Sequence, residues 1–330
     1  MKFLLTFCFF CVKNIYKKSN RGGLPLTGND MNDKKMKNLG RLALFSAALL
    51  WGVSFVAMKN VLTSIPTLYV VAIRFCGAAL ILLPACVRRF RKIDKVYLAG
   101  GAMMGVALLL AYIFQTYGLR LTTPGKNAFL TSAYCVIVPF LYWAYIRKKP
   151  DKFNAMAALI CIAGIGFISL DNDLHIGTGD ALTIACGLFF AIHIVITAKA
   201  VDKRDPVMLA VIQFATAGIL SLICAVIFEP APSGVTAVDV WTMVFLTVVS
   251  TAGCIMMQIF GQKYTPPSQT AVIMTFESVF GALSSVILYN EIMTFRLIVG
   301  FALTFAAVII SETKLEFIKR RRDAGPPAAR

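Results

Sequence analysis

Seven side chains that could contact or move a solute lie inside long apolar stretches of this sequence. A charged side chain at the centre of a membrane helix costs about 2.5–3.5 kcal/mol, so each charged or polar residue in such a place needs a partner or a function. We therefore treat these positions as candidates for substrate binding or coupling. They are Glu277, Arg74, Gln115, Gln258, Tyr134, His193 and Trp51.

Glu277 lies nine residues after Ser268. At about 1.5 Å per residue it would lie about 13 Å along a helix, close to the middle of a bilayer. A carboxyl group at that depth could carry a proton or pair with the ammonium group of a substrate. It could also be a packing group that bonds to a neighbouring hydroxyl or amide.

Arg74 lies seven residues into the second apolar stretch, and its long side chain could reach the interface from there. We favour a structural or gating ion-pair role over binding of a substrate carboxylate. Gln115 and Gln258 carry amides, which could bind a polar solute or join two helices. Both roles stay open for this pair.

Three ring side chains complete the set of candidates. Trp51 and Tyr134 could form a cavity wall or stack on a ring, and His193 could relay protons because its pKa is close to neutral. For all three, packing in an apolar helix is the favoured role. Because the chain has two histidines, we expect no histidine metal cluster. We also expect no other metal site, no catalytic residues and no cofactor.

The composition identifies the environment that these residues occupy. Hydrophobic residues make up 58% of the 330 residues and charged residues 15%, against about 45–50% and about 25% in soluble domains. This excludes a soluble enzyme or a DNA-binding domain and predicts an all-α polytopic membrane protein. The net charge of +17 comes from basic runs between apolar stretches and needs no nucleic-acid partner.

Ten stretches have the length of about 17–25 residues that a spanning helix needs. The loops between them are too short for a soluble domain. Because ten is even, the two chain ends must lie on the same side of the membrane. The predicted spans are Leu42–Leu62, Leu68–Val87, Val96–Tyr117, Asn127–Ile146, Phe153–Leu170, Asp180–Ala198, Val207–Phe228, Val240–Gly261, Gln269–Tyr289 and Phe295–Ser311.

The distribution of basic residues predicts the orientation. Of the 33 Lys and Arg residues, 28 lie in the tails and in the loops on the side of the termini, 4 lie on the opposite side, and Arg74 lies within a span. Basic residues favour the cytoplasmic side. We therefore expect a multi-pass protein of the cytoplasmic (inner) membrane with cytoplasmic N- and C-termini.

Two tails flank the spans. Residues 1–40 are expected to form a cytoplasmic N-terminal tail. A start codon assigned too far upstream would explain this segment, and a dispensable amphipathic tail is the alternative. Residues 314–330 are expected to form a basic cytoplasmic tail at the membrane surface.

An internal repeat relates the two halves of the chain. A shift of 139 residues aligns 72–75 with 211–214, and a shift of 143 aligns a shared Q-x2-G-x3-T-x-P-x3-A pattern that begins at Gln115 and at Gln258. The predicted repeats are 41–172 and 173–313, each with five spans. Because five is odd, the second copy would be inverted in the membrane, which is the plan of many secondary transporters.

The sequence resembles the drug/metabolite transporter superfamily in its ten-span form with two EamA-type repeats. The resemblance rests on Leu50-Trp51-Gly52-x-x-Phe55, Ile73-Arg74-Phe75, Gly118-Leu119, Ala128-Phe129-Leu130-Thr131-Ser132, Val138-Pro139, Thr275-Phe276-Glu277 and Asn290-Glu291.

The resemblance implies ten helices around a central cavity that is lined mainly by the first, third, fourth, sixth, eighth and ninth. It also implies export of an amino acid, related metabolite or drug more often than import. Because members often carry glutamate at position 277 and arginine at position 74 whatever their substrate, it favours structural roles for both residues.

We therefore expect a secondary transporter, and not an enzyme, that moves a small solute by alternating access and draws on a proton or counter-solute gradient. An integral-membrane enzyme or a channel without a transport cycle is the alternative. An enzyme would be expected to show clustered acids, histidines or metal ligands, and a channel would not require an inverted repeat.

Overall fold

The computed structural model describes residues 30–87, 93–146, 152–169, 176–201 and 204–313. Every secondary-structure element in this part of the chain is a helix. The helices are α2 (Asp30–Val61), α3 (Thr67–Cys86), α4 (Lys95–Leu121), α5 (Pro124–Thr131), α6 (Tyr134–Ile146), α7 (Lys152–Ser169), α8 (Thr178–Ala200), α9 (Pro206–Phe228), α10 (Ala237–Phe245), the π-helix η2 (Leu246–Gly253), α11 (Cys254–Tyr264), α12 (Pro267–Tyr289) and α13 (Phe295–Thr313).

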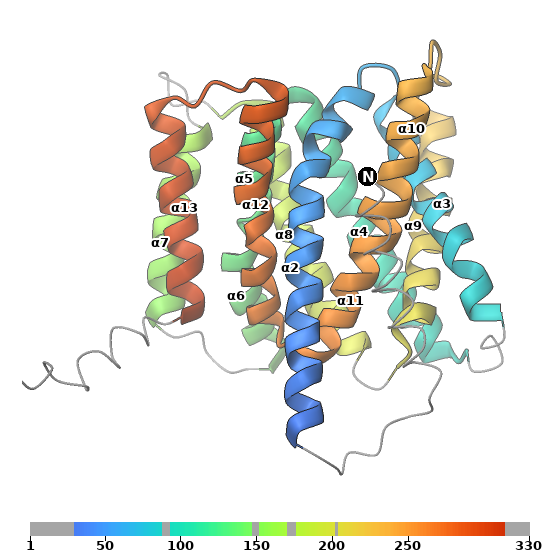
Figure 1. Cartoon of the computed structure of the whole chain (residues 1–330), viewed down its shortest axis with the longest axis horizontal. Coiled ribbons are helices and arrows are strands. Elements are labelled where there is room, and N and C mark those ends of the chain that lie inside the picture. The colour runs from blue at the N-terminus through green and yellow to red at the C-terminus, as the bar shows by residue number, and fades with distance from the viewer. Residues whose placement is uncertain (1–29, 88–92, 147–151, 170–175, 202–203, 314–330) are drawn as a thin grey trace, which may run out of the picture.

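The helices stand side by side with similar axis directions (Figure 1). Helices α7 and α13 pack together at one edge, and α3 packs on α9 at the other. Between these edges, α4 packs on α8 and α12 packs on α2. Residues from both halves of the chain therefore meet in the middle of the bundle.

Eight helical segments are long and apolar enough to cross a membrane. Helices α7 and α13 contain shorter apolar stretches, Ala155–Ile168 and Phe295–Ala307. Helices thus occur at each of the ten predicted positions, and eight of them meet the length and composition expected of a span. The protein is an all-helical polytopic membrane protein.

Prolines begin the helices that follow two of the loops. Helix α5 begins at Pro124 and α12 begins at Pro267. Proline suits the first turn of a helix because its fixed φ is helical and the missing N–H would have no partner there. The Oγ1 of Thr123 also accepts a hydrogen bond from the N–H of Lys126 at the start of α5.

Two predicted spans are interrupted. Helix α5 ends at Thr131 and α6 begins at Tyr134, so the fourth predicted span consists of two helices. Backbone bonds between residues three apart, such as Ala133 N to Leu130 O (3.2 Å), replace the usual i to i−4 bonds at this point. The Ser132 hydroxyl bonds the carbonyl of Ala128, and such side-chain bonds compete with regular helix geometry.

The other interruption is the π-helix η2 within the eighth predicted span. Residues 237–264 form a continuous helical segment of 28 residues, with the π-helix between α10 and α11. One extra residue in a helix is accommodated as a π-bulge. The Thr251 hydroxyl bonds the carbonyl of Leu246, five residues earlier, at 2.7 Å.

Glycines allow α4 to approach α9 closely. A Cβ atom on Gly101 would lie 2.6 Å from Ile212, and one on Gly105 would lie 2.7 Å from the carbonyl oxygen of Gln213. This agrees with the packing role that a G-x-x-x-G pattern indicates in membrane helices.

We predict that Gly105→Val destabilises the protein, because the new side chain would overlap the backbone of α9. Overpacking of this kind costs about 1–3 kcal/mol, and the thermal midpoint of the purified protein in detergent should fall by several degrees. Gly177→Ala is the control, since a Cβ there meets no atom within 4 Å. Equal midpoints for the two variants would contradict this packing.

Candidate functional site

A small cavity lies at the centre of the bundle. The space that it leaves for a water-sized sphere is about 20 Å³, and one water molecule needs about 10–15 Å³ on this measure. In this conformation the cavity therefore has room for about one water molecule and is closed to a metabolite. It is lined by Trp51, Ser54, Phe55, Met58, Arg74, Leu108, Tyr112, Gln115, Thr131, Tyr134, Phe190, Ile194, Gln258, Met274 and Glu277.

Six of the seven candidate residues line this cavity, and His193 is the exception. The six come from helices α2, α3, α4, α6, α11 and α12. The His193 ring is buried on α8, where its Nε2 lies 2.8 Å from the Oε1 of Gln213 and 3.3 Å from the hydroxyl of Thr197. These neutral partners favour the packing role for His193.

The buried Tyr134 hydroxyl in the cavity wall has no hydrogen-bond partner in the described part of the protein. Glu277 and Gln258 are two further polar wall residues whose functional groups remain available. Both are buried, with exposed fractions of 6% and 2%. Within the described residues, neither side chain makes a hydrogen bond or an ion pair. Because buried polar groups usually have partners, the two groups point to a ligand or water that completes their bonding.

Arg74 is held by neutral groups. Its Nε donates to the Oγ1 of Thr251 at 2.9 Å, and its Nη2 donates to the Oγ of Ser250 at 3.1 Å. The guanidinium carbon also lies 4.9 Å from the centre of the Tyr112 ring. The structure shows no ion pair for Arg74 among the residues it describes. Its contacts instead join α3 to the π-helix.

Helix α2 also binds the π-helix. The indole Nε1 of Trp51 donates to the carbonyl of Ser250 at 2.7 Å, and the hydroxyls of Ser250 and Ser54 lie 3.1 Å apart. Sequence reasoning identified Trp51 and Arg74 but missed Ser54, Ser250 and Thr251. The Ser250-Thr251 pair inside an apolar stretch was the available signal.

Gln115 differs from its repeat counterpart Gln258. Its Nε2 donates to the hydroxyl of Thr131 at 3.3 Å, and the side-chain Nδ2 of Asn127 donates to the backbone carbonyl of Gln115 at 3.2 Å. Asn127 also donates to the hydroxyl of Thr183 on α8 at 2.7 Å. Gln115 therefore joins α4 and α5, whereas Gln258 is free to contact a solute.

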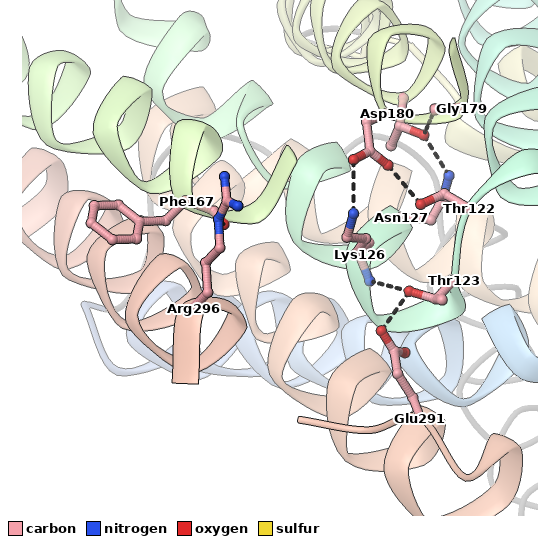
Figure 2. A network of polar contacts seen from close by, with 10 residues as sticks. Thr122, Thr123, Lys126, Asn127, Phe167, Gly179, Asp180, Glu291 and Arg296 are labelled. Carbon is pink, nitrogen blue, oxygen red and sulfur yellow. Dashed lines mark hydrogen bonds and ion pairs between the residues drawn. The ribbon is translucent and has the colours of Figure 1, made fainter. Parts of the chain in front are cut away.

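A polar network crosses one end of the bundle, where α4 and α12 end and α5 and α8 begin (Figure 2). Lys126 forms an ion pair with Asp180 at 3.1 Å, and the Thr122 hydroxyl donates to the same carboxylate at 2.6 Å. Glu291 accepts from the Thr123 hydroxyl at 2.5 Å, from the backbone N–H of Gly125 at 3.0 Å and from the Ser285 hydroxyl.

An apolar cluster lies on the same end of the bundle and closes it further. It includes Phe55, Met58, Val61, Leu119 and Leu246. Lys59 donates to the carbonyls of Leu119, Arg120 and Thr122 at 2.8–3.0 Å, so it binds the C-terminal end of α4. Lys59, Lys126 and Asp180 were not among the predicted site residues, and Glu291 was predicted only as part of a motif.

The profile of the EamA-like transporter family matches residues 38–170 and, a second time, residues 177–313. The chain belongs to the EamA-like transporter family. The two matches together cover most of the chain, and the fold is the multi-pass helical bundle described above. The protein is therefore a membrane transporter by family.

Two relatives of this chain are also named transporters. An "Uncharacterized transporter" of Archaeoglobus fulgidus is 32% identical over 274 residues, which cover 82% of this chain and 84% of that protein. The "Uncharacterized transporter YoaV" of Bacillus subtilis is 23% identical over 82% of this chain and 95% of its own length. A solved crystal structure of a protein matches with a TM-score of 0.66 over 85% of this chain and 98% of its own; at 17% identity it supports the fold alone.

We predict that Lys126 and Asp180 are energetically coupled, because their ion pair is partly shielded from water. The side chain of Lys126 is 27% exposed and that of Asp180 is 5% exposed. In a double-mutant cycle with Lys126→Gln and Asp180→Asn, the free energies of unfolding derived from the thermal midpoints should show a coupling of about 1–2 kcal/mol.

Lys95→Gln provides a matched loss of charge at the opposite end of α4, where the side chain is exposed. That variant should change the midpoint by less than about one degree. Strictly additive effects of Lys126→Gln and Asp180→Asn would mean that the ion pair does not hold this end of the bundle together.

Proposed function

We propose that this EamA-family protein is a secondary transporter that moves a small polar or amphipathic metabolite by alternating access. The central cavity is the solute site in this proposal, with the available groups of Glu277 and Gln258 as its polar contacts and Gln115 beside them in the wall. The observation that carries the proposal is the position of the available Glu277 and Gln258 groups in a cavity to which both halves of the chain contribute.

An inverted repeat would provide the two states that alternating access needs. In the first half a Cβ on Gly118 would lie 2.9 Å from the Gly179 carbonyl and would also meet Thr183. A Cβ on Gly261, 143 residues later, would lie 2.9 Å from the Gly40 carbonyl and would meet Leu44. The same helix contact thus recurs with the partners exchanged between the halves, which supports the repeat.

The two ends of the bundle differ in the way that an alternating cycle requires. The Lys126–Asp180 ion pair of 3.1 Å corresponds under the repeat to Gln269 and Arg41, which form an exposed hydrogen bond of 3.5 Å. The first pair is stronger than the second because it joins opposite charges and is better shielded from water. If the two ends exchanged these contacts, so that the Asp180 end became weak and the Arg41 end strong, the cavity would open toward the Asp180 end.

Export is the direction that we propose, on the basis of the expected orientation. With the basic loops in the cytoplasm, the network around Asp180 faces outward, and the weaker end faces the cytoplasm in the proposed cytoplasmic (inner) membrane. A cavity that is closed outside and loaded from inside suits an exporter. The energy would come from a proton or counter-solute gradient, with Glu277 as the coupling group.

We predict that Glu277→Gln abolishes gradient-driven transport, because the amide keeps the shape of the side chain but cannot exchange a proton. The measurement is flux of a panel of labelled amino acids, organic acids and amines in proteoliposomes with and without a proton gradient. The expected loss is at least tenfold for any solute that the unaltered protein moves.

Glu229→Gln is the matched control, since this glutamate lies outside the cavity at the end of α9, where it accepts from Tyr117 and from the backbone of Leu68. Unchanged gradient-driven flux in the Glu277 variant would reject the coupling role. Flux of unrelated ions at channel rates, with no saturation, would reject the carrier mechanism.

A further inference from the structure

A second, larger cavity lies at the end of the bundle opposite the Asp180 network. Its volume is about 620 Å³, within the 300–1,000 Å³ that is typical of small-molecule sites. We call it the vestibule. It lies between the C-terminal ends of α6, α8 and α11 and the N-terminal ends of α2 and α12, and its lining is Lys37, Tyr142, Val195, Ala198, Lys199, Val201, Gln262, Lys263, Tyr264, Thr265, Pro266 and Pro267.

The walls of the vestibule carry positive charge. Lys37, Lys199 and Lys263 all contribute to the lining and are exposed. Among the described residues that form these walls there is no aspartate or glutamate. A concave surface with charge of one sign concentrates ions of the opposite sign, so the vestibule attracts small anions.

Two buried groups in the vestibule lack partners. Gln262 and Thr265 are only 5% and 4% exposed. The Oε1 of Gln262 and the Oγ1 of Thr265 have no hydrogen-bond partner in the described part of the protein. A buried polar atom without a partner is costly. Both atoms lie beneath the vestibule surface, so the wall must move before N–H or O–H donors of a ligand can reach them.

The vestibule lies one helical turn from the central cavity. Ala198 and Gln262 line the vestibule, and Ile194 and Gln258, four residues earlier on the same helices, line the cavity. The Nε2 of Gln262 donates to the carbonyl of Ile194 at 3.2 Å, across the boundary between the two spaces. This one amide joins α11 to α8 at the boundary.

We propose that the vestibule is a binding site for a small soluble anion, with a carboxylate or phosphate group that pairs with Lys37 and Lys263 and donor groups for Gln262 and Thr265. Gln262 is the partition that must move before the anion reaches Glu277 and Gln258. The inference deepens the proposed function, on which it rests for the passage of the anion through the protein, but binding in the vestibule is measurable without transport.

The experiment measures the thermal midpoint of purified protein in uncharged detergent with sodium glutamate, citrate or inorganic phosphate, against sodium chloride at equal ionic strength. At about tenfold excess over the Kd, a bound anion should raise the midpoint by about 2–4 °C. The triple variant Lys37→Gln/Lys199→Gln/Lys263→Gln should lose this increase.

The matched control is Lys35→Gln/Lys95→Gln/Lys152→Gln, which removes three exposed lysines that lie outside the vestibule lining. It should retain the increase. The single variant Gln262→Leu keeps all the lysines and removes the acceptor. The anion concentration that gives half of the midpoint increase should rise at least fivefold in this variant. It serves as the test if the vestibule triple variant fails to fold.

The proposal is overturned if none of the anions raises the midpoint, or if both triple variants lose the increase equally. It is also overturned if the midpoint rises only in nanodiscs that contain phosphatidylglycerol and not with the soluble anions, because the site would then bind a lipid headgroup. Anion binding without flux in proteoliposomes would reject the proposed transport function and keep the vestibule site. Flux without anion binding would reject the vestibule site and keep the proposed transport function.

Discussion

The cost of placing polar groups in hydrocarbon is the constraint from which the rest of this structure follows. Charged and amide side chains in membrane helices must face one another, the backbone or an enclosed space. Arg74 satisfies this constraint through hydroxyl groups of the π-helix, and Gln115 through Thr131. Glu277 and Gln258 satisfy it only by facing the central cavity. The difference separates groups that hold the bundle together from groups that are available to a solute.

The π-helix connects these two roles. Its wide turn lies between Trp51 and Arg74, which bond its backbone and its hydroxyls and which both line the central cavity. A π-bulge often marks a functional site because it leaves helix backbone groups open to rearrangement. In the proposed cycle, a movement of α2 or α3 would change the wall of the cavity directly. The ion pair at Asp180 and the weaker contact at Arg41 would then decide which end yields first.

Local features of the sequence were sufficient to predict where the helices lie. Apolar length located helices at the expected positions, and six of the seven polar or aromatic candidates within these stretches line one cavity. The interruptions at Ser132 and at η2 were missed because each depends on single bonds within an otherwise regular apolar stretch. The pairing of Lys126 with Asp180, and of Thr123 with Glu291, joins residues 54 and 168 positions apart. Such pairings depend on how the helices pack, which no local pattern contains.

The central claim is that two halves of the chain enter the membrane from opposite faces and enclose one solute site. Asn38 near the start of α2 and Gly177 at the start of α8 are exposed and are related by the repeat shift of 139 residues. The direct test is to place a cysteine at each position in a cysteine-free background and to label it with a membrane-impermeant maleimide from either side. The account predicts labelling of Gly177→Cys from outside only and of Asn38→Cys from the cytoplasmic side only. Labelling of both positions from the same side would contradict it.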